Sequence, residues 1–169
     1  MEIKSRFKSR VAFAFGMVVF ALFTMSSTIA GGPSGDFDAA NFTAKMSVSH
    51  PAVGDTIEIV LTTTLPENLH IYGVVNECNG IGPLPPFWEN IELVDMEMVG
   101  DLYHGSEAEI VTDDIFECDL SMFSHKAEFR QKVKITGHHT NFKANFTYQM
   151  CSDALCKSFT YQAVIGHQH

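Results

Sequence analysis

Apolar and polar residues alternate along the last part of the chain, between Asn141 and Ile165. Every second residue from Phe142 to Met150 is apolar, and polar residues stand between them. The same alternation returns from Phe159 to Ile165. A period of two places the apolar residues on one face of an extended chain, as in a half-buried strand. The stretch therefore predicts a β-hairpin whose turn is the segment Cys151-Ser-Asp-Ala-Leu-Cys156.

Further short strands are predicted along the rest of the chain. Alternation and β-rich composition place them at 42–48, 57–61, 69–75, 91–99, 107–112 and 127–135. The last of these is the most one-sided, with Gln131 as the one polar residue on its inner side. Residues 79–86 cannot form regular structure, because two glycines and three prolines interrupt any ladder. Residues 113–124 are predicted to be an irregular acidic and aromatic segment.

These elements predict an all-β fold. No segment combines a 3.6-residue period with helix caps. Seven or eight short strands with frequent turn signals indicate an immunoglobulin-like antiparallel β-sandwich. The likeness to immunoglobulins is one of architecture only, because Cys78, Trp88 and Cys118 do not match the wider Cys…Trp…Cys spacing of antibody domains.

The first 30 residues have the layout of a secretory signal peptide. Basic residues from Lys4 to Arg10 precede an apolar run, Val11 to Met25, and small residues lead to Ala30. The apolar run is short for a membrane span, which needs roughly 20 residues, although an uncleaved anchor is the alternative. The expected organisation is a cleaved signal peptide (1–30), a flexible leader (31–40), one β-sandwich domain (41–166) and a tail (167–169). We expect a periplasmic protein.

The charge of the exported part excludes nucleic acid as a partner. The whole chain of 169 residues has a formal net charge of −9. Beyond residue 30, seven Lys and Arg residues face 19 Asp and Glu residues, so phosphates would be repelled. All four cysteines lie in this part, where export permits disulfides. No Ser/His/Asp arrangement, carboxylate pair or phosphate-binding loop indicates a hydrolase or a transferase.

Cys151 and Cys156 admit three interpretations. The first is a structural disulfide that clips the hairpin, and the second is a pair of metal ligands. A bridge closing their six-residue loop would stabilise the fold by only ~2 kcal/mol, against ~4 kcal/mol for a bridge between Cys78 and Cys118. Histidines and thiols could bind zinc or copper. However, one Cys-x4-Cys pair supplies half a metal site, and no second pair has matching spacing. We expect no metal and no other cofactor.

The third interpretation, thiol–disulfide exchange, is the one that the position of the pair favours. Exchange requires an accessible sulfur, a second sulfur close enough to resolve the mixed disulfide, and a surface that docks a partner. The mouth of a hairpin meets the first two requirements. The pair is not at a helix start, and Asp153 would raise a thiol pKa rather than lower it. We therefore expect a passive shuttle that reacts when a better nucleophile is brought to it.

Four features, in order along the chain, resemble a known family. They are the segments Leu69-His-Ile-Tyr72, Gly82-Pro-Leu-Pro-Pro-Phe87, Asp114-Ile-Phe-Glu117 with the following strand from Ala127 to Val133, and Tyr148-Gln-Met-Cys151-Ser-Asp-Ala-Leu-Cys156. The resemblance covers about residues 41–165. They resemble the N-terminal periplasmic domain of the thiol:disulfide interchange protein DsbD, in the version found in Bacteroidetes-type sequences.

The resemblance implies a redox function for the hairpin pair. In that family an immunoglobulin-like domain receives electrons from a membrane-embedded thiol carrier or a thioredoxin-like domain and reduces exported disulfide-bearing proteins, including in cytochrome c assembly. It implies that Cys151 and Cys156 are the redox pair and that Phe116 caps them. Tyr72 and His70 match strand positions that line the site. The protein would thus be a component of a protein-disulfide reductase system.

The sequence also departs from the family and leaves some questions open. Lys157 follows the second cysteine, where the family often has proline. The membrane and thioredoxin-like domains are absent from these 169 residues, so we expect a separate donor protein. Cys78 and Cys118 could be bridged as a structural disulfide, free, or a second redox pair. Which hairpin cysteine attacks first is open, with Cys156 favoured as the resolving thiol. The alternative function is a non-catalytic exported binding module whose disulfides are structural.

Overall fold

Ten β-strands and no helix make up the described part of the chain, which in this computed structural model is residues 36–166 except 77, 79–81, 106–107 and 114–116. The strands are β1 (Thr43–Met46), β2 (Thr56–Thr64), β3 (His70–Asn76), β4 (Phe87–Val94), β5 (Met96–His104), β6 (Glu109–Asp113), β7 (Cys118–Phe123), β8 (Lys126–Ile135), β9 (Asn141–Cys151) and β10 (Cys156–Gly166). The predicted signal peptide and C-terminal tail lie outside the described residues. No described helix has the length and apolar character needed to cross a membrane.

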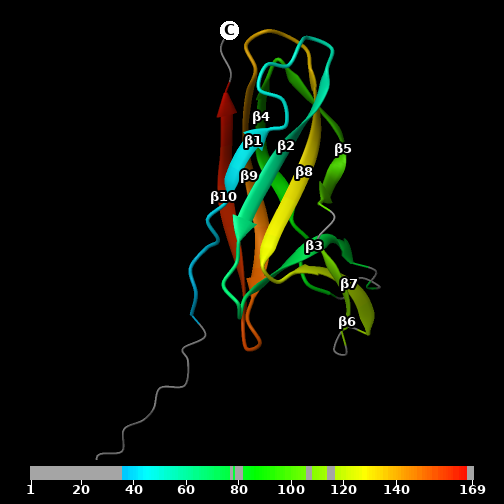
Figure 1. Cartoon of the computed structure of the whole chain (residues 1–169), viewed down its shortest axis with the longest axis vertical. Helices are drawn as coiled ribbons and strands as arrows, with labels where there is room; N and C mark the ends of the chain where they lie inside the picture. The colour runs from blue at the N-terminus through cyan, green and yellow to red at the C-terminus, as the bar shows by residue number, and fades with distance from the viewer. Residues whose placement is uncertain (1–35, 77, 79–81, 106–107, 114–116, 167–169) are drawn as a thin grey trace, which may run out of the picture. The chain divides into compact units, whose positions relative to one another are not determined.

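The strands form two antiparallel sheets that pack face to face (Figure 1). One sheet has the order β1-β2-β8-β5, and the other has the order β10-β9-β3-β7-β6. Strand β9 pairs with β10 along one edge, while its other edge is shared between β4 and the start of β3. The prediction of an all-β, immunoglobulin-like antiparallel sandwich is therefore confirmed.

Aromatic side chains from both sheets fill the space between them. The ring of Phe146 on β9 lies 5.0 Å from that of Phe129 on β8 and 5.3 Å from that of Phe42, all three being buried. These residues occupy the alternating apolar positions of their strands, and full burial of each such side chain contributes about 1.5–3 kcal/mol. The predicted alternation along β8, β9 and β10 is thus the source of the core.

The prediction of a single strand over 91–99 is wrong, because Asp95 separates β4 from β5. Asp95 has φ 52°, a left-handed conformation that Asp adopts more readily than most residues. Its carboxylate accepts a hydrogen bond of 2.8 Å from the His139 N–H, and its carbonyl accepts one of 2.9 Å from the Thr136 N–H. Asp95 thus marks a chain reversal that divides the predicted strand into two.

The prediction of irregular structure over 113–124 is also wrong, since β7 occupies Cys118–Phe123 and β6 ends at Asp113. Leu120 and Phe123 are buried on opposite faces of β7. The residues of β7 do alternate between apolar and polar from Cys118 to Met122. The acidic residues that precede and enter the strand, over 113–119, led instead to the prediction of a loop.

Gln131 lies inside the sandwich, as its place on the inner side of the predicted strand indicated. It is 1% exposed, and its Nε2 group donates to the carbonyls of Val99 (3.3 Å) and Gly100 (3.2 Å). The register of β5 against β8 shifts between Val99 and Tyr103, and Gly100 has φ 65°. The amide therefore pairs backbone carbonyls at a bulge in β5, which explains one polar residue in an apolar core.

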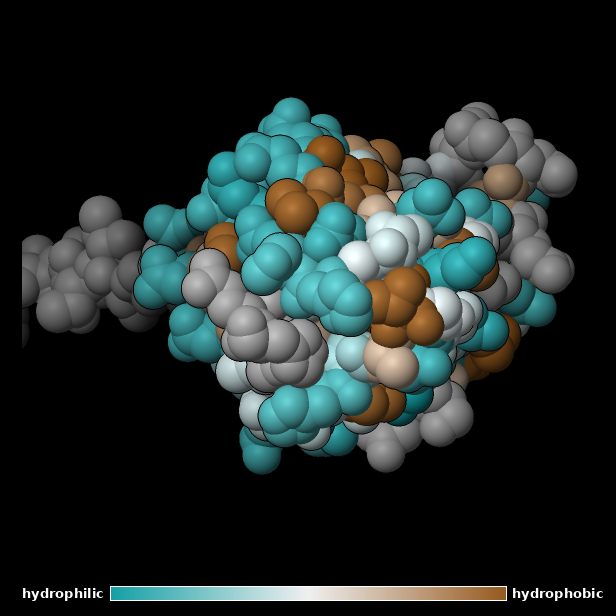
Figure 2. Space-filling model, turned by 90° about the horizontal axis from the view of Figure 1, so that it is seen from above, coloured by the Kyte–Doolittle hydropathy of each residue, from teal (hydrophilic) through white to brown (hydrophobic). Residues whose placement is uncertain are grey.

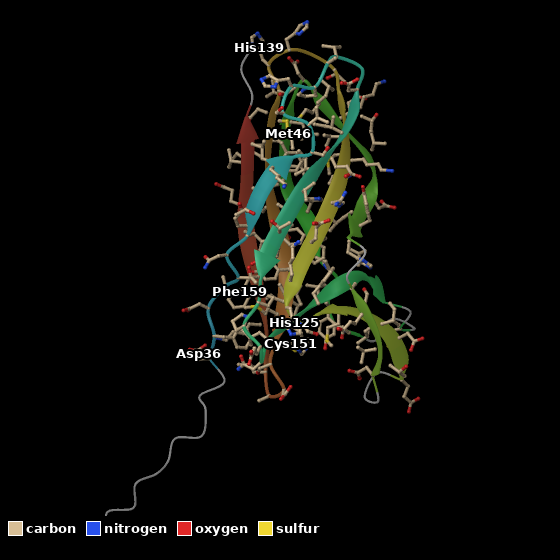
Figure 3. The ribbon with its side chains drawn as sticks, viewed as in Figure 1. Asp36, Met46, His125, His139, Cys151 and Phe159 are labelled. Carbon is tan, nitrogen blue, oxygen red and sulfur yellow. A yellow bond between two sulfur atoms is a disulfide. The ribbon has the colours of Figure 1, made fainter. Side chains whose placement is uncertain are left out.

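The described end of the predicted leader is attached to the sandwich. Tyr148 Oη accepts a hydrogen bond of 2.8 Å from the Ala40 N–H. Asp36 forms an ion pair with Lys157, and the rings of Phe37 and Phe159 lie 6.0 Å apart. Figure 3 shows Asp36 and Phe159 near the same end of the sandwich as Cys151. At the opposite end, hydrophobic residues form separate spots among hydrophilic ones (Figure 2).

Candidate redox site

The β9–β10 hairpin brings Cys151 and Cys156 together as directly opposed residues. They are partners in the antiparallel register, their Cα atoms are 4.0 Å apart, and they form a disulfide. The turn between them is held by Ser152, whose N–H donates to the Leu155 carbonyl at 2.9 Å. The Ser152 hydroxyl oxygen also accepts from the N–H groups of Ala154 and Leu155. Local hydrogen bonds therefore fix the turn independently of the disulfide.

The two cysteines differ in their exposure to solvent. Cys151 is 1% exposed, whereas Cys156 is exposed. Cys151 is covered because β3 continues the sheet beside it, and His70 is its direct partner on that strand. Cys156 lies on β10, the outermost strand of this sheet. His70, Cys151 and Cys156 thus form one row across three strands, with only the last sulfur-bearing residue open to a partner.

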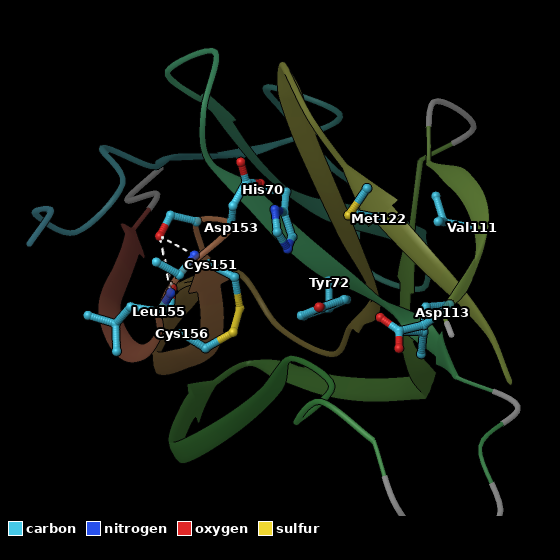
Figure 4. Close-up of a pocket in the computed structure, with 12 residues that line it drawn as sticks. His70, Tyr72, Val111, Asp113, Met122, Cys151, Asp153, Leu155 and Cys156 are labelled. Atoms are coloured by element: carbon cyan, nitrogen blue, oxygen red, sulfur yellow. Dashed lines mark hydrogen bonds between the residues drawn. A yellow bond between two sulfur atoms is a disulfide. The ribbon is translucent and has the colours of Figure 1, made fainter. Parts of the chain in front are cut away.

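A pocket of about 400 Å³ opens beside the disulfide on the outer face of the six-stranded sheet (Figure 4). Its walls come from β3, β6, β7 and the β9–β10 turn. The lining residues are His70, Tyr72, Val111, Asp113, Leu120, Met122, Cys151, Ser152, Asp153, Ala154, Leu155 and Cys156. Alternate residues of each strand face the pocket, because side chains alternate across a sheet. The site therefore combines the disulfide with a concave, largely apolar surface.

The floor of this pocket is a small apolar cluster, separate from the main core. Tyr72, Leu120 and Cys151 are its buried members, and Cys78 and Cys118 pack against it. Cys78 and Cys118 form the second disulfide, with Cα atoms 5.1 Å apart. It ties the segment after β3 to the start of β7. Of the three states that the sequence left open for this pair, the structure contains the bridged one, and it supports the pocket floor.

The two rings beside the disulfide are held in their neutral forms. Burial lowers the pKa of His70, and the nearby Asp153 carboxylate acts in the opposite direction. Burial also raises the pKa of the Tyr72 phenol, with a further contribution from the Asp113 carboxylate. The rings lie 5.3 Å apart in an edge-to-face arrangement. His70 and Tyr72 are therefore uncharged near neutral pH, and the charged side chains of the pocket are Asp153 in the hairpin turn and Asp113 at the end of β6.

Four of the predicted site residues come together at the pocket. Cys151, Cys156, His70 and Tyr72 all line the pocket. Phe116, the predicted cap, lies outside the described residues. The last described residue before it is Asp113, which lines the pocket.

Sequence reasoning missed the part of the site that β6 and β7 contribute. Asp113, Leu120 and Met122 line the pocket but were assigned to an irregular segment, so no face could be predicted for them. One signal was available: Cys118, Leu120 and Met122 are spaced by two and share a face if the segment is a strand.

No group of three or more His, Cys, Asp or Glu side chains that could hold a metal ion comes together among the described residues. Both hairpin sulfurs are bonded to each other.

Comparison with known proteins finds similar folds but no sequence relative. No protein-family model matches the sequence, and no curated protein matches it. The crystal structure of the DsbD N-terminal domain from Neisseria meningitidis, in the reduced form, is similar at 16% identity and a TM-score of 0.47, over 76% of this chain and 86% of that chain. The N-terminal periplasmic domain of ScsB from Proteus mirabilis is similar at 16% identity and a TM-score of 0.48, over 73% of this chain and 44% of that chain. One of the two is from DsbD, the family that the sequence resembles.

Proposed function

We propose that this protein is a periplasmic thiol–disulfide exchange domain in which Cys151 and Cys156 cycle between dithiol and disulfide. The observation that carries the proposal is the position of the disulfide: it joins a buried cysteine to an exposed one at the rim of a pocket. The turn hydrogen bonds of Ser152 hold the hairpin whether or not the sulfurs are joined. The turn therefore does not need the disulfide to hold it, while exchange needs the accessible sulfur that Cys156 provides.

The exposure of the two cysteines defines the order of bond changes. A thiolate of a reduced donor attacks Cys156 Sγ, the bond to Cys151 breaks, and its electron pair leaves on Cys151 Sγ, which takes a proton from water. The donor's second thiol then attacks the donor sulfur of the mixed disulfide and releases Cys156. The donor ends as a disulfide and the hairpin as a dithiol. In the second half of the cycle, the Cys156 thiolate attacks the disulfide of an oxidised exported protein, and Cys151 resolves the mixed disulfide. The exported protein is then reduced, and the Cys151–Cys156 disulfide forms again.

In this order, Cys156 forms the mixed disulfide with the partner, and Cys151 is the thiol that resolves it. The sequence alone favoured Cys156 as the resolving thiol. Burial of Cys151 favours the opposite assignment, because a partner sulfur reaches the exposed Cys156 first. The partners proposed are a membrane thiol carrier or thioredoxin-like donor and exported disulfide-bearing substrates.

A redox titration of the purified protein tests the function. Thiols are alkylated at each potential, and peptide mass spectrometry reports the two disulfides separately. We expect the Cys151–Cys156 pair to titrate at about −180 to −270 mV, the range of exchange proteins. If the pair stays bridged below about −300 mV, it is a structural staple, and the protein is a non-catalytic binding module. In a donor-to-substrate exchange assay, Cys151→Ser and Cys156→Ser should each abolish turnover and leave the β-sheet circular dichroism unchanged.

Phe116 is proposed as the cap of this pocket. It follows Asp113, a wall residue, by three positions, and an aromatic ring over the sulfurs would exclude water and small thiols. Phe116→Ala should therefore speed reduction of the Cys151–Cys156 disulfide by dithiothreitol several-fold, whereas Phe37→Ala, in the leader, should not. Equal reduction rates in the wild type, Phe116→Ala and Phe37→Ala would show that Phe116 does not cover the disulfide.

A further inference from the structure

The charges that line the redox pocket are of one sign. Asp113 enters it from the end of β6 and Asp153 from the β9–β10 turn. None of the described lining residues is lysine or arginine. Lys157, which follows Cys156, is ion-paired with Asp36 and does not line the pocket. Among the described lining residues, the charged side chains at neutral pH are therefore these two carboxylates.

The two carboxylates act on groups that flank the sulfurs. In Figure 4, Tyr72 lies between the disulfide and Asp113. The Asp113 carboxylate contributes to the raised pKa of Tyr72, and the Asp153 carboxylate opposes the lowering of the His70 pKa. His70 and Tyr72 do not neutralise the carboxylates, because burial keeps both rings uncharged. The electric field of each carboxylate thus acts on His70 or Tyr72, the side chains beside which an incoming sulfur would dock.

Thiol–disulfide exchange is sensitive to such a field. The attacking sulfur is an anion, and the negative charge is shared among three sulfurs as the old bond breaks. Two carboxylates at the pocket repel that charge, and a cationic side chain on the incoming partner offsets the repulsion. Small anionic thiols bring further negative charge and no compensation.

We propose that Asp113 and Asp153 make this pocket select partner segments with lysine or arginine beside the reactive cysteine, and slow exchange with anionic thiols. The proposal rests on the exchange function of Cys151 and Cys156. It specifies the partner as a cationic thiol or disulfide segment. It also gives the domain a way to avoid small anionic thiols such as glutathione without a large steric barrier.

The test measures the second-order rate of reduction of the Cys151–Cys156 disulfide by three peptides of equal length. They place one cysteine between two lysines, two glutamines or two glutamates. Each rate is divided by the rate of the same peptide with hydroxyethyl disulfide, which removes differences in thiol pKa and nucleophilicity. The proteins compared are the wild type, Asp113→Asn, Asp153→Asn and the double variant. Asp119→Asn is the matched control, because Asp119 is exposed on β7 and belongs to the opposite face of the sheet from Leu120.

For the wild type we expect the normalised rate to fall from the lysine to the glutamine to the glutamate peptide. Each pocket substitution should narrow the lysine-to-glutamate ratio about two- to fivefold at low ionic strength, and 0.5 M salt should narrow it in the wild type. Asp119→Asn should keep the wild-type ratio. Equal normalised rates for the three peptides, or a ratio unchanged in the double variant, would overturn the selection. Failure of all three peptides to reduce the pair at potentials near −270 mV would instead overturn the exchange function.

Discussion

At the scale of single residues, the site depends on one cross-strand row. His70 is the register partner of Cys151, and Cys151 is the register partner of Cys156. Opposed residues of an antiparallel pair point to the same face of the sheet. The chain therefore places one imidazole and two sulfurs on the same surface without any irregular backbone.

The pKa of His70 predicts how stability depends on pH. Burial lowers this pKa from the usual 6.5, so the unfolded chain binds a proton to His70 more readily than the folded chain does. Stability from the neutral imidazole is fully present above about pH 6.5 and is lost as the pH falls toward the folded-state pKa. Between pH 7.5 and 5, the wild type should lose more free energy of unfolding in urea than His70→Gln does.

Asp153→Asn provides the matched variant for this pH effect. The Asp153 carboxylate raises the pKa of His70 and so opposes the effect of burial. Its removal should make the loss of stability on acidification larger than in the wild type. A loss that is equal in the wild type, His70→Gln and Asp153→Asn would show that His70 does not titrate differently in the folded and unfolded chains.

Tyr148 connects the leader to the core through its hydroxyl group. The side chain is fully buried, and its oxygen accepts a hydrogen bond of 2.8 Å from the Ala40 N–H. Tyr148→Phe keeps the ring packing and removes this bond, so we expect a loss of about 1 kcal/mol in urea denaturation. Limited proteolysis should also cut residues 36–40 faster in the variant. An unchanged cleavage rate would mean that the leader is held by its other contacts, those of Asp36 and Phe37.

At the scale of elements, the least regular parts of the sandwich depend on single polar groups. The bulge in β5 exposes the carbonyls of Val99 and Gly100 to the interior, and Gln131 on β8 donates to both. At the break between β4 and β5, the Asp95 carboxylate accepts a hydrogen bond from the His139 N–H in the loop after β8. A single polar side chain thus satisfies backbone groups at each of these irregular places.

Gln131→Leu tests this role of the β8 side chain. Leucine fills nearly the same volume but cannot donate a hydrogen bond to the buried carbonyls of the bulge. The free energy of unfolding should therefore fall by about 1–3 kcal/mol. Gln162→Leu on β10 is the control, because Gln162 is exposed and such surface changes usually stay within about 0.5 kcal/mol. Similar stabilities for the two variants would show that water or backbone rearrangement satisfies the bulge.

At the scale of the whole molecule, the two disulfides differ in the length of chain they restrain. Cys78 and Cys118 are separated by 40 positions, whereas Cys151 and Cys156 are separated by five. Loop-closure entropy then predicts that removal of the first bridge costs about 4 kcal/mol and removal of the second about 2 kcal/mol. Urea denaturation of the Cys78→Ala/Cys118→Ala and Cys151→Ala/Cys156→Ala variants measures both. The reverse order would assign the structural role to the hairpin pair.

Much of the fold could be predicted because one-sided strands carry a period of two. Strands β8, β9 and β10 have polar outer and apolar inner positions, and the hairpin turn between the last two was marked by its cysteines. Strand β6 was predicted approximately, but the segment that follows it was interpreted as a loop because of its acidic residues. The alternation of Cys118, Leu120 and Met122 in β7 was the available signal. Asp113 could not be recognised as a site residue until the structure placed it on the pocket wall.

The length of the β9–β10 ladder has a consequence for how the redox state is communicated. The disulfide joins the last of 11 register pairs, which run from Cys151 and Cys156 to Asn141 and Gly166. Cleavage of that bond frees only a short turn that already holds itself by Ser152. Among the described residues, reduction would therefore change the hairpin little beyond its turn. In the proposed exchange cycle, a partner would then distinguish the dithiol from the disulfide at the sulfur atoms themselves, by reactivity and not by shape.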